Sequence, residues 1–193
     1  MARDLGKMHD LTGQLSLCIP ARGSFKSPDD YISLFISWLS KRTRYLRTEA
    51  GKHTFEGGVL SALGVPISEG ALVSLSFSFR DATPEFLDEL LVAATNEYAT
   101  CTMRISMRFE GEISKVRGLL KESSGDFSET EEGNFSGSLS LHGQVVRVNA
   151  YPSVNRLNLE CTLGRWSGTP SVLIRSLLMG KAPTSVFRRL FGR

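Results

Sequence analysis

The chain has 193 residues, of which 41% are hydrophobic and 22% charged, and this composition excludes a disordered or fibrous protein. A chain of this length can bury enough surface to fold without disulfides or metals. No apolar run reaches the roughly 18 residues of a membrane-spanning helix, and residues 1–10 lack the apolar core of a signal peptide, so we expect a cytoplasmic protein.

Charge is unevenly distributed along the chain. Residues 1–80 carry a net charge of +3, residues 81–136 a net charge of −7, and residues 137–193 a net charge of +7. The stretch from Lys121 to Phe135, KESSGDFSETEEGNF, is the most acidic. Segregated charge of this kind bears on partners and self-association more than on the fold.

Two strand–helix pairs are predicted in the first half of the chain. Residues 14–20 alternate apolar and polar side chains, as a half-buried strand does. Ser27-Pro28-Asp29 places a capping serine, an early proline and an acid at a helix start, and this helix should end near Arg47. The pattern returns 56 residues later at Thr83-Pro84-Glu85, before a second amphipathic helix. Either a duplicated strand–helix unit or two unrelated caps would explain this.

Further strands are predicted around these helices. Residues 48–70 are glycine-rich and indicate a long loop with a short strand near Val59, whereas residues 72–80 and 101–109 alternate clearly. Residues 135–149 predict a hairpin, and residues 154–163 predict one more strand.

This pattern indicates an α+β fold. We expect a mostly antiparallel sheet of about five to seven strands with two main helices packed on one face, and a ferredoxin-like core within the first 110 residues. Residues 1–193 should form a single domain. Within it we expect an N-terminal tail (1–12), an acidic loop between two halves (118–134) and a C-terminal helical segment (170–193).

The residues that could carry chemistry indicate a protein without enzymatic activity. The three cysteines lie far apart in strand-like patterns, so we interpret them as buried small side chains, and no metal or cofactor site is predicted. No phosphate-binding loop, nucleophile elbow or matched pair of acids can be identified. An enzyme without a local motif, with His53 and Glu56 as its candidate residues, is a further alternative. A surface histidine in a loop is the simpler interpretation of His53.

Nucleic-acid binding is one alternative function. Cations stand beside aromatic residues in two places, a combination that suits phosphate contacts and base stacking. Arg80, Arg104 and Arg108 add to them on the exposed face of the middle strands, whereas the acidic middle of the chain would repel phosphate. The candidate residues are Lys41, Arg42, Arg44, Arg47, Arg165 and Trp166.

Binding to a protein partner is the leading hypothesis. The acidic stretch offers an aromatic anchor among carboxylates, and aromatic residues tend to carry interface energy. A flexible connector is the other interpretation, in which a buried Phe127 would pin the stretch to the domain. The candidate contacts are Asp126, Phe127, Glu129, Glu131 and Glu132.

In its size, segregated charge and lack of catalytic motifs, the chain resembles bacterial immunity proteins, which neutralise a cognate toxin in the cytoplasm. The resemblance implies a tight complex with a basic or nucleic-acid-directed toxin. It also implies that acidic side chains fill the cationic site of that toxin in place of substrate phosphate.

Overall fold

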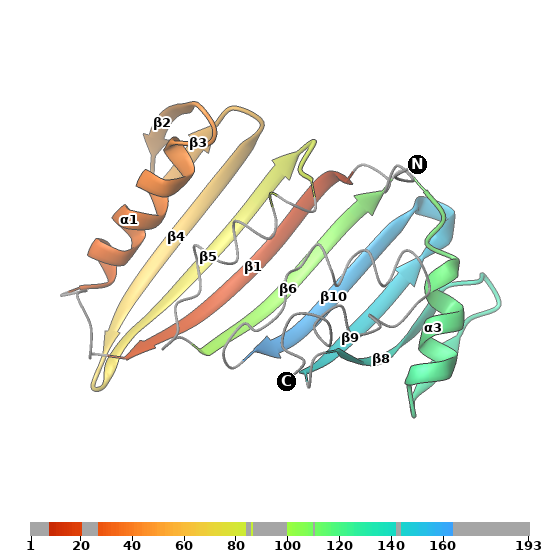
Figure 1. Ribbon diagram of the computed structural model, residues 1–193. Helices are drawn as coiled ribbons and strands as arrows, with labels where there is room; N and C mark the ends of the chain where they lie inside the picture. Colours follow the sequence, from red (N-terminus) through yellow and green to blue (C-terminus); the bar gives the residue numbers. More distant parts are fainter. Residues whose placement is uncertain are drawn as a thin grey trace, which may run out of the picture.

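The computed structural model describes residues 8–20, 27–83, 86, 100–109, 111–141 and 144–163. These residues form one antiparallel sheet of ten strands, with the helices α1 (Pro28–Ser40) and α3 (Lys115–Ser123) packed on one of its faces (Figure 1). The fold is therefore mainly β, and the expected α+β fold with five to seven strands is wrong.

The strands follow the order β2-β3-β4-β5-β1-β6-β10-β9-β8-β7 across the sheet. A short 3-10 helix, η1 (Pro152–Val154), joins β9 to β10. The strand bounds are β1 Met8–Pro20, β2 Tyr45–Glu49, β3 Lys52–Phe55, β4 Gly58–Ile67, β5 Gly70–Arg80, β6 Thr100–Phe109, β7 Phe127–Glu129, β8 Phe135–Leu141, β9 Gln144–Tyr151 and β10 Arg156–Leu163.

The strand order divides the molecule into two similar halves. One half is β1–α1–β2–β3–β4–β5 and the other is β6–α3–β7–β8–β9–β10. In each half, four strands form a meander and the first strand lies beside the last. The halves meet where β1 pairs antiparallel with β6, so an approximate two-fold axis passes between these strands (Figure 1). The repeated unit is thus longer than the strand–helix unit suggested by the two caps.

Alternation along the strands gathers the core on the face that carries the helices. On β5, for example, Val73, Leu75 and Phe77 are buried, whereas Ser76 and Ser78 between and beyond them are exposed. The helix α1 buries Tyr31, Phe35 and Leu39, and α3 buries Val116, Leu119 and Leu120. These apolar faces supply most of the free energy of folding, since each fully buried side chain contributes about 1.5–3 kcal/mol.

Local chemistry explains the bounds of α1. Ser27 caps its first turn, because its Oγ accepts a hydrogen bond from the backbone nitrogen of Asp30 at 3.2 Å. The helix ends at Ser40 rather than near Arg47, because the next residues form a turn and then the edge strand β2. Tyr45, which helical spacing assigned to α1, instead packs edge-on against Phe55 of β3, with ring centroids 5.4 Å apart.

The sequence predictions differ from the structure in four further places. Residues 48–70, expected as a loop, contain β3 and β4, and residues 8–12, expected in a tail, belong to β1. Residues 118–134, expected as an acidic loop, contain the end of α3, the strand β7 and a turn. The ferredoxin-like core is wrong, because β2, β3 and β4 follow α1 before β5 reaches β1.

Two predicted helices fall largely or entirely outside the described residues. For the helix predicted after Thr83, the structure shows only its start, where the backbone nitrogen of Phe86 donates to Thr83 Oγ1 at 3.1 Å. The C-terminal helical segment, 170–193, lies wholly outside them.

Candidate functional site

The face of the sheet opposite α1 and α3 carries the candidate site, and we call it the open face. No described helix lies on it (Figure 1). The residues that alternate with the core point toward it, and most of them are serine, threonine, asparagine, glutamine or arginine. Its chemistry nevertheless differs between the two halves of the sheet.

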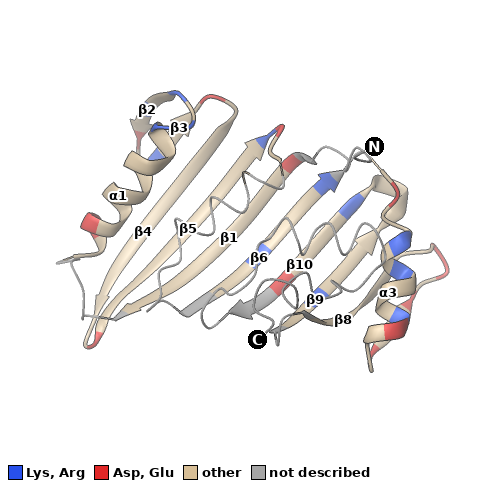
Figure 2. Cartoon of the chain, in the orientation of Figure 1, with Lys and Arg blue, Asp and Glu red and all other residues tan. Residues whose placement is uncertain are grey.

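Exposed apolar residues gather on the open face of the first half. Leu63 is 66% exposed, and Val65 and Leu72, which pair directly across β4 and β5, are 46% and 44% exposed. The strand β4 has no charged residue and β5 has only Arg80 (Figure 2). Clustered exposed apolar residues typically mark an interaction surface. We call this group, Val59, Leu63, Val65, Ile67 and Leu72, the apolar lobe.

Cys18 adjoins the apolar lobe, directly opposite Leu72 on β1. Its side chain is exposed and has a free thiol, so the expectation that all three cysteines are buried is wrong for this one. The side chains of Cys101 and Cys161 lie outside the described set.

Arginines occupy the open face of the second half (Figure 2). The register brings residues of β6, β10 and β9 together in three rows that cross the strands, with asparagine and serine in the middle row. The rows are Arg104–Glu160–Arg147, Ser106–Asn158–Asn149 and Arg108–Arg156–Tyr151.

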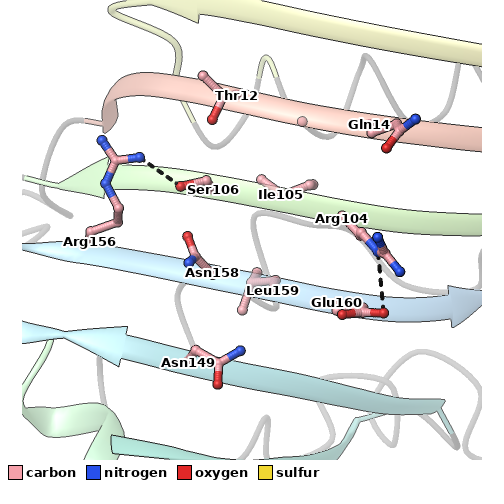
Figure 3. A pocket seen from close by; sticks show the side chains of 11 residues that line it. Thr12, Gln14, Arg104, Ile105, Ser106, Asn149, Arg156, Asn158, Leu159 and Glu160 are labelled. Atoms are coloured by element: carbon pink, nitrogen blue, oxygen red, sulfur yellow. Dashed lines mark hydrogen bonds and ion pairs between the residues drawn. The ribbon is translucent and has the colours of Figure 1, made fainter. Parts of the chain in front are cut away.

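A hollow of about 510 Å³ lies over the middle row. Arg156 Nη1 donates to Ser106 Oγ at 2.9 Å, and Arg104 Nε lies 3.3 Å from Glu160 Oε1 (Figure 3). Between these two contacts, Asn158 Oδ1 is buried and has no hydrogen-bond partner among the described residues. We call this site the polar hollow; its polar lining consists of Thr12, Gln14, Arg104, Ser106, Asn149, Arg156, Asn158 and Glu160.

The polar hollow and part of the apolar lobe occupy equivalent positions in the two halves. The β4–β5 hairpin closes on the pair Ile67–Gly70, and the β9–β10 hairpin closes on the pair Tyr151–Arg156. Two residues further along each strand, Val65–Leu72 corresponds to Asn149–Asn158. One fold thus presents apolar groups on one side of the approximate two-fold axis and polar groups on the other.

The acidic residues predicted to bind a partner lie on a hairpin at the β7 edge of the sheet. Phe127 is half-buried against the core, with its ring centroid 6.4 Å from that of Phe135, so the hairpin is fixed to the domain. Glu129 forms an ion pair with Arg117 of α3. Asp126, Glu131 and Glu132 remain exposed.

The predicted basic cluster lies at the opposite corner, where α1 ends and β2 begins. The guanidinium carbon of Arg42 lies 4.1 Å from the centroid of the Trp38 ring, and Arg47 Nη1 lies 3.8 Å from Glu49 Oε2. Lys41 and Arg44 are exposed beside them. Since β2 and β6 are five strand spacings apart, about 24 Å, this cluster is separate from the arginines of β6. Arg165 and Trp166 lie outside the described residues.

His53 lies on β3, near the same corner. Its Nδ1 is 3.0 Å from Thr48 Oγ1, and burial lowers the pKa of its imidazole below 6.5. Both residues of the proposed pair, His53 and Glu56, lie within the described residues, and no ion pair joins them. The arrangement gives the histidine a structural partner and no acid to orient it.

The described residues offer neither a metal site nor a membrane-spanning helix. They contain no cluster of three or more histidine, cysteine, aspartate or glutamate side chains that could hold a metal ion. No helix among them has the length and hydropathy needed to cross a membrane.

Comparison with known proteins shows no family. No protein-family model and no curated protein matches the chain. It aligns with the class II 3-hydroxy-3-methylglutaryl-CoA reductase from Streptococcus pneumoniae at 12% identity and a TM-score of 0.20. The alignment covers 90% of this chain and 58% of the reductase chain, and at this TM-score the two folds are not alike.

The apolar lobe and the polar hollow were both missed from the sequence. The hollow joins residues of four strands between Thr12 and Glu160, and only the register brings them together. One indication of the hollow was present in the sequence: the alternation of apolar and polar residues along β6 placed Arg104 and Arg108 on an exposed face.

Proposed function

We propose that this protein is a non-catalytic binding domain that holds another protein against its open face. The apolar lobe is the observation that carries the proposal. Its side chains stay exposed on a face that no described helix covers, and Leu63, Val65 and Leu72 are in adjacent positions. Contact with a partner would remove this apolar area from water.

The surface of the partner should combine apolar groups with carboxylates. On the open face, the apolar lobe adjoins a half that is rich in arginine, and no lysine occurs in β4, β5, β1, β6, β10 or β9. Arginine is enriched in protein interfaces and lysine is depleted, because the planar guanidinium binds carboxylates in pairs of hydrogen bonds. An acidic protein therefore fits this face, and opposite charge would speed encounter.

Three exposed leucines, two in the apolar lobe and one on the opposite side of the molecule, allow a controlled test. Once co-purification has identified a partner, its affinity is measured by calorimetry for the wild type, for L63S/L72S and for Leu34→Ser. Leu34 lies on α1 and is 57% exposed. Losing two interface leucines should weaken binding at least tenfold, since burial of each contributes about 1.5–3 kcal/mol. The Leu34→Ser variant should bind as the wild type does. Equal affinity of all three proteins would contradict the proposal.

In its finer form, the proposal is that the partner is a toxin which binding inhibits. Its support is the resemblance of the chain to immunity proteins in size and charge segregation. A toxin bound at the open face would present carboxylates to the arginines, unlike the basic toxin that the resemblance implies. Expression of this protein together with the toxin should restore the growth of bacteria that the toxin inhibits. The L63S/L72S variant should fail to restore it. A variant with Asp126, Glu131 and Glu132 changed to serine is the comparison. Loss of rescue with this variant alone would move the contact to the acidic hairpin, and absence of rescue by the wild type would contradict the role as inhibitor.

A second candidate function is nucleic-acid binding through the same face. The observation that favours it is the gathering of five arginines on the central strands. Fluorescence anisotropy with single-stranded and duplex probes, at about 50 mM salt and above, tests it, because phosphate contacts weaken steeply as salt rises. Absence of binding at the lowest salt excludes this function. The arginines are Arg80, Arg104, Arg108, Arg147 and Arg156.

A further inference from the structure

The polar hollow has features that contact with a flat protein surface does not require. Its volume of about 510 Å³ is in the range of small-ligand pockets, roughly 300–1,000 Å³, but it is a shallow depression open to solvent and not an enclosed cavity. Its polar groups come from β1, β6, β9 and β10, and they lie side by side on one face across the junction of the two halves (Figure 3). The hollow is therefore distinct from the apolar lobe in both place and chemistry.

One end of the hollow is suited to an anion. The hydrogen bond from Arg156 Nη1 to Ser106 Oγ holds the guanidinium in place, and a guanidinium has five N–H donors, so four of them are free of this contact. A fork of donors held in this way suits the two oxygens of a carboxylate or phosphate. At the other end, Glu160 engages Arg104, so an anion is directed to the Arg156 end.

The middle of the hollow is suited to a hydrogen-bond donor. Asn158 Oδ1 is buried and unpartnered, and leaving a buried acceptor unsatisfied destabilises a protein. Thr12, Gln14 and Asn149 add hydroxyl and amide groups around it. These groups both donate and accept hydrogen bonds, as the hydroxyl groups of a ligand do.

The fold does not require these polar groups. The residues at the positions equivalent to Asn149 and Asn158 are Val65 and Leu72, and the same antiparallel strand pairing forms with them. The second half therefore carries polar side chains where the first half has apolar ones. Strand pairing alone does not explain why these residues are polar.

We propose that the polar hollow binds a small hydroxylated anion, in which an acid group is attached to a carbon skeleton that carries hydroxyl groups. The acid group lies at Arg156, and a hydroxyl group donates to Asn158 Oδ1, which must turn from its buried position toward the hollow to accept the hydrogen bond. The acid is a phosphate or a carboxylate, because both have the oxygens that a guanidinium binds. The site does not use the apolar lobe, but its arginines lie on the face that the proposed protein partner would cover, so a control variant separates the two proposals.

Calorimetry with four probes tests the proposal. Glucose 6-phosphate and gluconate each combine an acid with hydroxyl groups, whereas inorganic phosphate and glucose each supply one of the two. We expect one of the combined probes to bind at least tenfold more tightly than phosphate and glucose, and the choice between them distinguishes phosphate from carboxylate. If neither combined probe binds, or if phosphate alone binds as tightly, the proposal is overturned.

Variants then locate the binding. Arg156→Gln and Asn158→Leu should each weaken the preferred probe about tenfold or more, the second by introducing the residue found at the equivalent position in the first half. Lys115→Gln, which removes one positive charge on α3, should leave the affinity unchanged. Thermal melting checks that each variant is folded. If Arg156→Gln is not, Arg156→Lys replaces it, because lysine keeps the charge but lacks the fork of donors that binds two oxygens. Unchanged affinity in the folded hollow variants would place the ligand elsewhere.

A last control keeps the two proposals apart. The L63S/L72S protein should bind the preferred probe as the wild type does, because neither leucine lines the hollow. A loss of probe affinity in this variant would overturn the independence of the hollow from the apolar lobe.

Discussion

Replacing Gly13 with alanine should destabilise the protein, whereas the same change at Gly118 should stabilise it. Gly13 lies in the middle of β1, paired with Phe77 of β5 on one side and with Ile105 of β6 on the other. A Cβ atom at this position would lie 2.7 Å from Cε2 of Phe77 and 3.0 Å from Cε1. Since Phe77 is only 4% exposed, its ring has little room to move away.

The magnitude follows from two opposing terms. Forcing an extra methyl group into a packed core costs about 1–3 kcal/mol, and the smaller conformational freedom of alanine in the unfolded chain returns about 0.4–1 kcal/mol. With both terms near the middle of their ranges, the net loss at Gly13 is about 1–2 kcal/mol, or about 2–8 °C in Tm for a chain of this size. At Gly118 in α3, a Cβ would have no atom within 4 Å, so Gly118→Ala should gain about 0.5–1 kcal/mol.

Urea and thermal unfolding followed by circular dichroism measure both changes. The decisive protein is the double variant G13A/F77L, in which the added methyl group no longer meets a ring. Gly13→Ala should then cost at least about 1 kcal/mol less than it does in the wild type, which is a coupling energy usual for residues in contact. If the cost is the same in both backgrounds, Phe77 is not the cause and the reasoning is refuted.

Three further predictions concern single side chains. Ser27→Ala should cost about 1 kcal/mol in unfolding free energy, because the cap of α1 is lost, whereas Ser33→Ala in the exposed middle of that helix should cost nothing. The pKa of His53 should lie below 6.5 when it is measured by NMR. Because this pKa is lower in the folded state, the unfolded state takes up the proton first, and the free energy of unfolding should fall as the pH decreases through this region. A folded His53→Gln protein should lack this pH dependence. Cys18 should react with a thiol reagent in the folded protein, and Cys18→Ser should remove that reaction, while modification that requires unfolding would contradict its exposure.

The alternation of apolar and polar residues identified the strands that have one buried face and one solvent-exposed face. The predicted strands at 14–20, 72–80, 101–109 and 154–163 are confirmed within β1, β5, β6 and β10, and the hairpin at 135–149 is confirmed as β8 and β9. These segments combine large inward residues with polar outward ones, so tertiary structure and local pattern agree.

The strand β4 was hidden because it inverts this pattern. Its inward positions include the small residues Gly58, Ala62 and Gly64, while Leu63 and Val65 point outward. At Gly58 the reason is packing, since the ring of Phe79 occupies the place of a side chain. The features that conceal the strand are thus the ones that create the apolar lobe.

The helix α3 was missed for lack of local signals. Ser114 precedes it but makes no side-chain capping hydrogen bond, and the helix has only nine residues, including Gly118. Contact of Leu119 and Leu120 with the sheet stabilises it, and this cannot be anticipated from propensity alone.

The pairing of β1 with β6 has a consequence for how the chain folds. Each meander joins strands that are neighbours in sequence, so hairpins such as β4–β5 can close over a short loop. The central strand β1 instead pairs with residues far along the chain, Asp10 with Arg80 and Thr12 with Ser106. Sheets dominated by such non-local contacts fold in milliseconds to seconds, and we expect the joining of the two halves to limit the rate. The open face would be completed only in that step, because the polar hollow takes Thr12 and Gln14 from β1 and Arg104 and Ser106 from β6.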